Sequence, residues 1–146
     1  MREIKFRAWD KDEKKIERVG AIDWDGNFEI ITCNTEDNKH YMTEPDQFIL
    51  MQYTGLKDKN KVEIYPDDII RWDSGFGDEP VVGKVIEEWG QVGPCCGPNV
   101  MNYILWLPPD KYHPKGYTLH NFWELKDIEV IGNIYENPEI LKEVTK

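Results

Sequence analysis

Apolar and polar residues alternate along much of the chain, which is the periodicity of a half-buried β-strand rather than of a helix. Within residues 3–9, for example, Ile4, Phe6 and Ala8 fall on one face of an extended chain. The basic residues between them fall on the other face. We therefore predict an N-terminal strand with one face on a core.

Five later segments are also rich in β-branched and aromatic residues, the composition that strands favour. They are 62–65, 68–72, 81–89, 102–107 and 128–135. A further run, FILMQY at 48–53, is apolar throughout and is too short to decide between a buried strand and a helical turn.

Turn chemistry separates these segments. Asp25-Gly26 lies between two alternating runs in residues 20–32 and predicts a two-residue hairpin turn. Residues 11–15 are a polar turn, residues 33–46 a polar loop, and residues 107–117, with three prolines, an irregular excursion.

Only the C-terminal end has helical features. Asn137 can cap a helix, Pro138 suits its first position, and EILKEV follows. The predicted fold class is thus mostly β. It has N-terminal β-hairpins, a small barrel or roll, and one short C-terminal helix.

Charge is unevenly distributed along the 146 residues, whose formal net charge is −10. Residues 1–19 hold seven basic against five acidic side chains, residues 20–80 five against fourteen, and residues 81–146 six against nine. An acidic middle repels phosphate backbones, so net charge does not favour nucleic acid. Solubility, a basic protein partner or mimicry of nucleic acid all agree with it.

The three cysteines, Cys33, Cys95 and Cys96, are an odd number, and the first residues are charged where a secretory signal would be apolar. No apolar run has the length of a membrane span. We therefore expect a cytoplasmic protein with reduced thiols and no membrane partner.

Residues 52–70, QYTGLKDKNKVEIYPDDII, are the densest candidate for a site, with a glycine turn, a charged tip and an acidic pair. Turn chemistry gives a structural interpretation, in which residues 57–61 are a solvated loop tip. The carboxylates of Asp67 and Asp68 then accept hydrogen bonds from local backbone amides. The alternative makes both residues metal ligands, for which two adjacent carboxylates are weak evidence.

Other residues capable of chemistry do not form a recognisable motif. The adjacent Cys95 and Cys96 do not have the spacing of paired zinc ligands. The sole serine, Ser74, does not lie in a nucleophile elbow, and His40 has no partner nearby in sequence. We predict no catalytic residue, metal or cofactor.

Aromatic residues are abundant, with six Trp, and core packing is their simplest explanation. Trp9, Trp24 and Trp72 have charged neighbours, which indicates partial exposure. The basic stretch around Arg7 is the place for an anionic partner. The predicted interaction surface consists of Arg7, Trp9, Trp24, Trp72, Asp67 and Asp68.

Three blocks of the chain resemble the YopX family of phage and prophage proteins. They are MREIKFRAWD, the central LMQYTGLKDKN with EIY and DII, and IEVIGNIYENPEIL. Lys61 and Asp67 stand where such proteins typically have Gly, which tolerates positive φ more readily. The resemblance implies a mostly β fold with an N-terminal β-hairpin region over residues 1–47, a C-terminal SH3-like small barrel or roll over residues 48–146, and self-association. It implies no catalytic residues.

These observations favour a non-enzymatic phage or prophage accessory protein that acts through protein contacts, as a homo-oligomer with an unidentified protein partner. Two alternatives stay open. One is a nucleic-acid-associated small barrel that uses a Trp/Arg face, and the other is an acidic DNA mimic.

Overall fold

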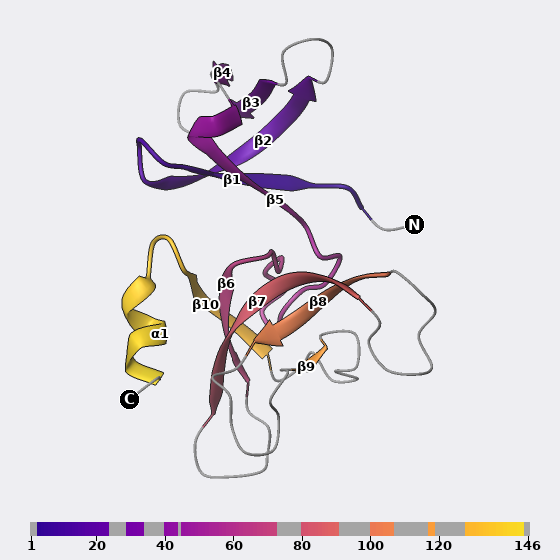
Figure 1. The fold of residues 1–146 in the computed structure, drawn as a ribbon, viewed down its shortest axis with the longest axis vertical. Coiled ribbons are helices and arrows are strands. Elements are labelled where there is room, and N and C mark those ends of the chain that lie inside the picture. Colours follow the sequence, from indigo (N-terminus) through magenta and orange to yellow (C-terminus); the bar gives the residue numbers. More distant parts are fainter. Residues whose placement is uncertain are drawn as a thin grey trace. The chain divides into compact units, whose positions relative to one another are not determined.

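A computed structural model of the chain describes residues 3–23, 29–33, 40–43, 45–72, 80–90, 100–106, 117–118 and 128–144. The chain divides into two compact units, Met1–Tyr53 and Thr54–Lys146, which we call unit 1 and unit 2. Each contains one antiparallel sheet, and the strands are labelled in Figure 1.

The unit 1 sheet has the order β4-β3-β2-β1-β5, so that β4 and β5 are its edge strands. Its elements are β1 (Phe6–Asp10), β2 (Lys15–Asp23), β3 (Glu29–Cys33), β4 (His40–Thr43), the 3-10 turn η1 (Pro45–Gln47) and β5 (Phe48–Gln52).

Both faces of the unit 1 sheet bury side chains. Ala8 and Phe48 pack together on one face, against Val19 and Leu50. Because successive residues of a strand alternate between faces, Trp9 and Met51 lie on the other, where they are 8 % and 2 % exposed. Apolar burial on both faces therefore holds β1 and β5 in this sheet.

A side chain shapes the turn between β1 and β2. Asp10 Oδ1 accepts hydrogen bonds from the backbone N–H groups of Asp12 and Glu13, both at 2.9 Å. Lys14 then takes a positive φ of 53°, and Asp10 pairs with Lys15 across the turn. The predicted polar turn at 11–15 is confirmed.

The unit 2 sheet has the order β10-β6-β7-β8-β9. Its elements are β6 (Asp68–Trp72), β7 (Val81–Gly90), β8 (Val100–Trp106), β9 (Tyr117–Thr118), β10 (Ile128–Asn133) and the helix α1 (Pro138–Val144). The core consists of Ile64, Ile70, Val85 and Ile128, all fully buried. Within the described residues, no helix has the length and apolar character that a membrane crossing requires.

A β-bulge in β10 prepares the start of α1. The register of β10 against β6 shifts between Val130 and Gly132. A Cβ at Gly132 would lie 2.5 Å from Asn137 Oδ1, so only glycine leaves room for that side chain. Asn137 precedes the helix, and its carbonyl accepts the Ile140 N–H at 3.2 Å. The predicted C-terminal helix is confirmed.

The mostly β class is confirmed, and several predicted details are corrected. The described strands of unit 2 form a sheet with two ends rather than a closed barrel, so the SH3-like part stays a prediction. The run at 48–53 is a strand, and it pairs with β1. The two compact units divide after Tyr53, and the domain boundary after residue 47 stays a prediction.

Other boundaries also differ. Residues 33–46 are not one polar loop, because they include β4. Residues 62–65 do not form a strand, since their one ladder contact is an isolated bridge between Lys57 and Glu63. Ile4 precedes β1 and is 73 % exposed, contrary to its expected place on the core face. The Asp25-Gly26 turn lies outside the described residues, although β2 and β3 pair antiparallel as expected.

Candidate functional site

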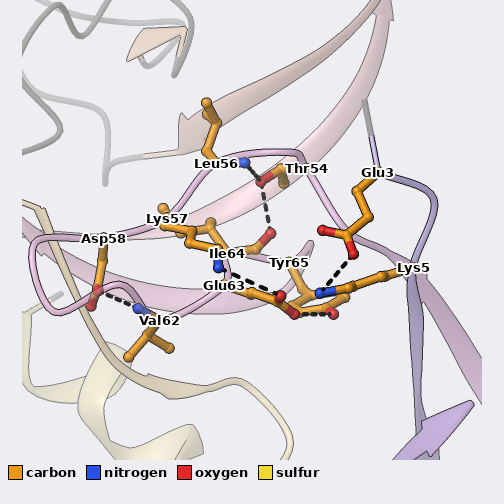
Figure 2. Close-up of polar contacts among 10 residues, drawn as sticks. All are labelled: Glu3, Lys5, Thr54, Leu56, Lys57, Asp58, Val62, Glu63, Ile64 and Tyr65. Atoms are coloured by element: carbon orange, nitrogen blue, oxygen red, sulfur yellow. Dashed lines mark hydrogen bonds and ion pairs between the residues drawn. The ribbon is translucent and has the colours of Figure 1, made fainter. Parts of the chain in front are cut away.

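The loop between β5 and β6, residues 54–67, begins with a ring of hydrogen bonds that closes it on itself. The Thr54 N–H and Oγ1 both donate to the Ile64 carbonyl, at 3.1 and 2.7 Å. The Leu56 N–H donates to Thr54 Oγ1 (Figure 2). The Ile64 N–H donates to the Leu56 carbonyl. Gly55, with φ of 87°, allows the tight reversal. The predicted glycine turn is therefore one side of a closed loop.

The Asp58 carboxylate is the organising group at the loop tip. Oδ1 accepts the backbone N–H groups of Asn60 and Val62, both at 2.8 Å. Oδ2 accepts the Val130 N–H of β10 at 3.0 Å. One buried side chain therefore shapes the loop and fastens it to a strand more than seventy positions away in the sequence.

The prediction that residues 57–61 form a solvated tip is wrong for Asp58, which is only 5 % exposed. The Lys59 N–H also donates to the Ile128 carbonyl at 2.9 Å, so the tip lies against β10. The side chains of Lys57, Lys59 and Lys61 are exposed, as expected. The loop thus presents basic groups outward over a buried carboxylate.

Asp68 is fully buried, and its Oδ2 accepts the Tyr65 backbone N–H at 2.8 Å. This confirms the structural interpretation of Asp68, in which the acid satisfies a local amide at the start of a strand. Among the described residues, no group of three or more His, Cys, Asp or Glu side chains could hold a metal ion.

Asp67 connects the end of its own loop to β7 and to the turn that follows β10. Its Oδ2 accepts the Tyr135 hydroxyl at 2.6 Å, and its Oδ1 lies 3.3 Å from Lys84 Nζ. Its N–H donates to the Val85 carbonyl, and its own carbonyl accepts the Ile134 N–H. The carboxylate therefore joins side chains from elsewhere in the unit, rather than local amides as predicted.

Lys61 and Asp67, the two positions where the sequence resemblance led us to expect glycine, both have a glycine-like backbone. Lys61 has φ of 66° and Asp67 has φ of 67°, the left-handed region that side chains other than glycine enter at a cost. The turn geometry is thus maintained by the surrounding hydrogen bonds and not by the residue type.

Glu129, on β10, forms ion pairs with two basic side chains, Lys59 of the loop and Arg71 of β6. Its Oε2 lies 2.9 Å from Lys59 Nζ and 2.5 Å from Arg71 Nη2. Hydrogen bonds from these two side chains lower the pKa of Glu129 to about 2. The carboxylate is therefore ionised at neutral pH, and it offsets part of the basic charge around it.

The remaining predicted surface residues lie in different places. Arg7 is half-buried, with Nη2 3.6 Å from Met51 Sδ, and it lies opposite Arg18 across β1 and β2. Trp9 is buried, so its predicted partial exposure is wrong. Trp72 is half-buried against the unit 2 core, and Trp24 lies outside the described residues.

Arg7 and Trp9 thus belong to unit 1, and Trp72, Asp67 and Asp68 belong to unit 2. The residues of the other rejected motifs, Ser74, Cys95 and Cys96, lie outside the described residues. His40 lies in β4, where it pairs in register with Cys33 of β3.

Sequence reasoning missed four residues that organise this region, Thr54, Asp58, Glu129 and Tyr135. Asp58 had a usable signal, because a loop aspartate often accepts the backbone N–H two residues on in an Asx turn, as Asp58 does from Asn60. The contacts of Glu129 and Tyr135 join residues 58 to 70 positions apart, and no local pattern predicts them.

Comparison with known proteins agrees with the three blocks noted in the sequence. The family model for the YopX protein matches residues 5–142, nearly the whole chain. The crystal structure of protein EF1440 from Enterococcus faecalis is similar, with a TM-score of 0.55 and 23 % identity. The match covers 97 % of this chain and 99 % of that one, and it supports the fold alone. No curated protein matches the chain.

Proposed function

The chain belongs to the YopX family, and from this premise we propose that it is a non-enzymatic phage or prophage accessory protein that self-associates and acts through protein contacts. One observation carries the proposal. In residues 52–70, the segment that most resembles a site, the buried carboxylates stabilise the fold. Asp58 and Asp68 accept four backbone N–H groups between them. We therefore assign the function to exposed side chains on the protein surface.

The exposed surface around the loop suits contact with another macromolecule. Lys57, Lys59, Lys61 and Arg71 are all exposed on a chain whose net charge is −10. These four side chains form a basic rim around the loop, and a basic rim attracts acidic groups of another molecule. This attraction favours encounter with an acidic protein surface. A second copy of this chain supplies such a surface.

Sedimentation velocity of the full chain at micromolar concentrations tests self-association. The expected result is a concentration-dependent species larger than the monomer, weakened by salt if charge contributes to the contact. A strict monomer over that concentration range would remove self-association from the proposal.

Nucleic acid is a second candidate, favoured by the same four exposed basic side chains. Fluorescence anisotropy with a single-stranded oligonucleotide at low salt tests it. Binding should fall as salt rises, because phosphate contacts release counterions. The Lys61→Glu variant should bind more weakly than Lys142→Glu, which makes the same charge change on α1. Absence of salt-sensitive binding eliminates this candidate.

A further inference from the structure

The outer edge of β5, meaning the backbone N–H and C=O groups of Phe48, Leu50 and Gln52, points away from the sheet. Two hydrogen bonds fix this direction, from the Tyr53 N–H to the Lys5 carbonyl and from the Lys11 N–H to the Gln47 carbonyl. In an antiparallel pair, alternate residues bond to the partner strand. The odd-numbered residues of β5 therefore bond to β1, and the even-numbered ones face outward.

No described strand pairs with this outer edge, because β5 is the last strand of its sheet. Edge strands normally carry a charge, a proline or a bulge that prevents pairing with another chain. The sequence of β5, FILMQ, has no charge and no proline, and its register with β1 is unbroken from Phe6–Gln52 to Asp10–Phe48. The edge is thus a flat template for another strand.

We propose that the outer edge of β5 pairs antiparallel with the same edge of a second copy, about a two-fold axis at Leu50. The proposal rests on the self-association proposed above and names the surface that mediates it. Leu50 would face the partner's Leu50, and Phe48 would face the partner's Gln52. Each outward donor then meets an outward acceptor, so that the edge is complementary to itself.

Charge favours a second copy at this place. Two chains of net charge −10 repel each other, so a contact between copies is easiest where acidic groups are few. β5 is uncharged, and the adjacent β1 carries one basic and one acidic residue, Arg7 and Asp10. The pairing would join two five-stranded sheets into one continuous sheet.

A disulfide trap tests the register directly. In a variant with Cys33, Cys95 and Cys96 replaced by Ser, Leu50→Cys would place two Cα atoms about 5.5 Å apart in a hydrogen-bonded pair, within disulfide reach. Ile49→Cys in the same background is the control, because its diagonal separation from the partner's Ile49 is about 7–8 Å. Mild oxidation should give a covalent dimer of the first variant and far less of the second.

Gln52→Pro is an independent test. It removes an outward N–H but no bond to β1, and proline is tolerated at such edge positions. Self-association should weaken at least tenfold while the unfolding midpoint changes little. Equal cross-linking of both cysteine variants, or unchanged association of Gln52→Pro, would overturn the β5 contact.

The two proposals fail separately. Self-association that persists without the Leu50→Cys cross-link removes only this edge. A monomeric wild-type chain would remove both proposals. That result would also be expected if the outer edge of β5 pairs with an extended peptide of another protein instead of a second copy.

Discussion

β5 and the loop that follows it are neighbours in sequence with opposite chemistry. β5 is uncharged and regular, and it leaves a row of outward backbone groups without a described partner. The loop over residues 54–67 is highly charged and irregular, yet its amides and buried carboxylates satisfy one another. The loop, which looks like a site in the sequence, thus has its buried polar groups satisfied internally. β5, which looks like core in the sequence, has outward backbone groups that no described strand pairs with.

The comparison shows what buried aspartates do in this chain. The buried Asp58 and Asp68 in unit 2, and the more exposed Asp10 in unit 1, each accept backbone N–H groups at the start of a turn or strand. A carboxylate can satisfy several donors where no ladder is available. Acidic residues between short strands therefore indicate turn architecture before they indicate catalysis.

Removal of the Asp58 carboxylate should give the largest effect. Asp58→Ala leaves the partly buried amides of Asn60, Val62 and Val130 without their acceptor. Each buried donor left unsatisfied costs about 1–3 kcal/mol, so we expect unit 2 to lose roughly 3–5 kcal/mol after partial hydration. Hydrogen exchange measures the loss unit by unit.

Asp58→Asn is the matched control. It retains an oxygen for Asn60 and Val62 and loses the acceptor for Val130, so its loss should be about one third of that of alanine. If Asp58→Ala changes stability by less than about 0.5 kcal/mol, as at an ordinary surface position, the loop is held by something other than this carboxylate.

Truncation of Met51 tests the contribution of β5 to the stability of unit 1. Met51 is 2 % exposed in β5, and its replacement by Ala should cost about 2–4 kcal/mol through lost burial and a cavity. Amides of unit 1 should then exchange faster while those of unit 2 change little. A uniform increase over both units would mean that the two segments do not belong to separately stabilised units.

The two positive-φ residues of the loop over residues 54–67, Lys61 and Asp67, should respond to glycine with opposite signs. Lys61→Gly relieves a left-handed backbone whose cost is roughly 1 kcal/mol, and its side chain has no partner among the described residues. Unit 2 should gain about 0.5 kcal/mol after the extra chain entropy of glycine. Asp67→Gly relieves the same strain but loses Tyr135 and Lys84, so about 1 kcal/mol net should be lost.

Urea denaturation of both glycine variants measures these changes. Stabilisation by both substitutions would show that the Asp67 contacts contribute little. Destabilisation by both would show that the Lys61 side chain contributes a contact of its own.

Local pattern predicted what depends on local chemistry, such as the period-two strands, the turn at 11–15, the helix after Asn137 and the Asp68 cap. It missed what depends on distant segments. The strand nature of 48–53 comes from pairing with β1, and the burial of Asp58 comes from the Val130 amide. Trp9 was expected to be partly exposed because its neighbours are charged, whereas both faces of the sheet bury side chains and Trp9 is buried.

The smallest effect concerns the rim of the loop, where Glu129 holds Lys59 and Arg71. The pKa of Glu129 is lowered to about 2 from 4.5, so its ionised form favours the folded state. That contribution is complete above pH 4.5, the ordinary value, and is lost as the pH falls toward 2. Unfolding midpoints of wild type and Glu129→Gln should differ at pH 6 and converge near pH 2, with salt reducing the difference because these groups are partly exposed. A difference that does not change with pH would mean that Glu129 acts through packing and not through its charge. Convergence near pH 2 would show that the contribution of Glu129 comes from its ionised carboxylate and its contacts with Lys59 and Arg71.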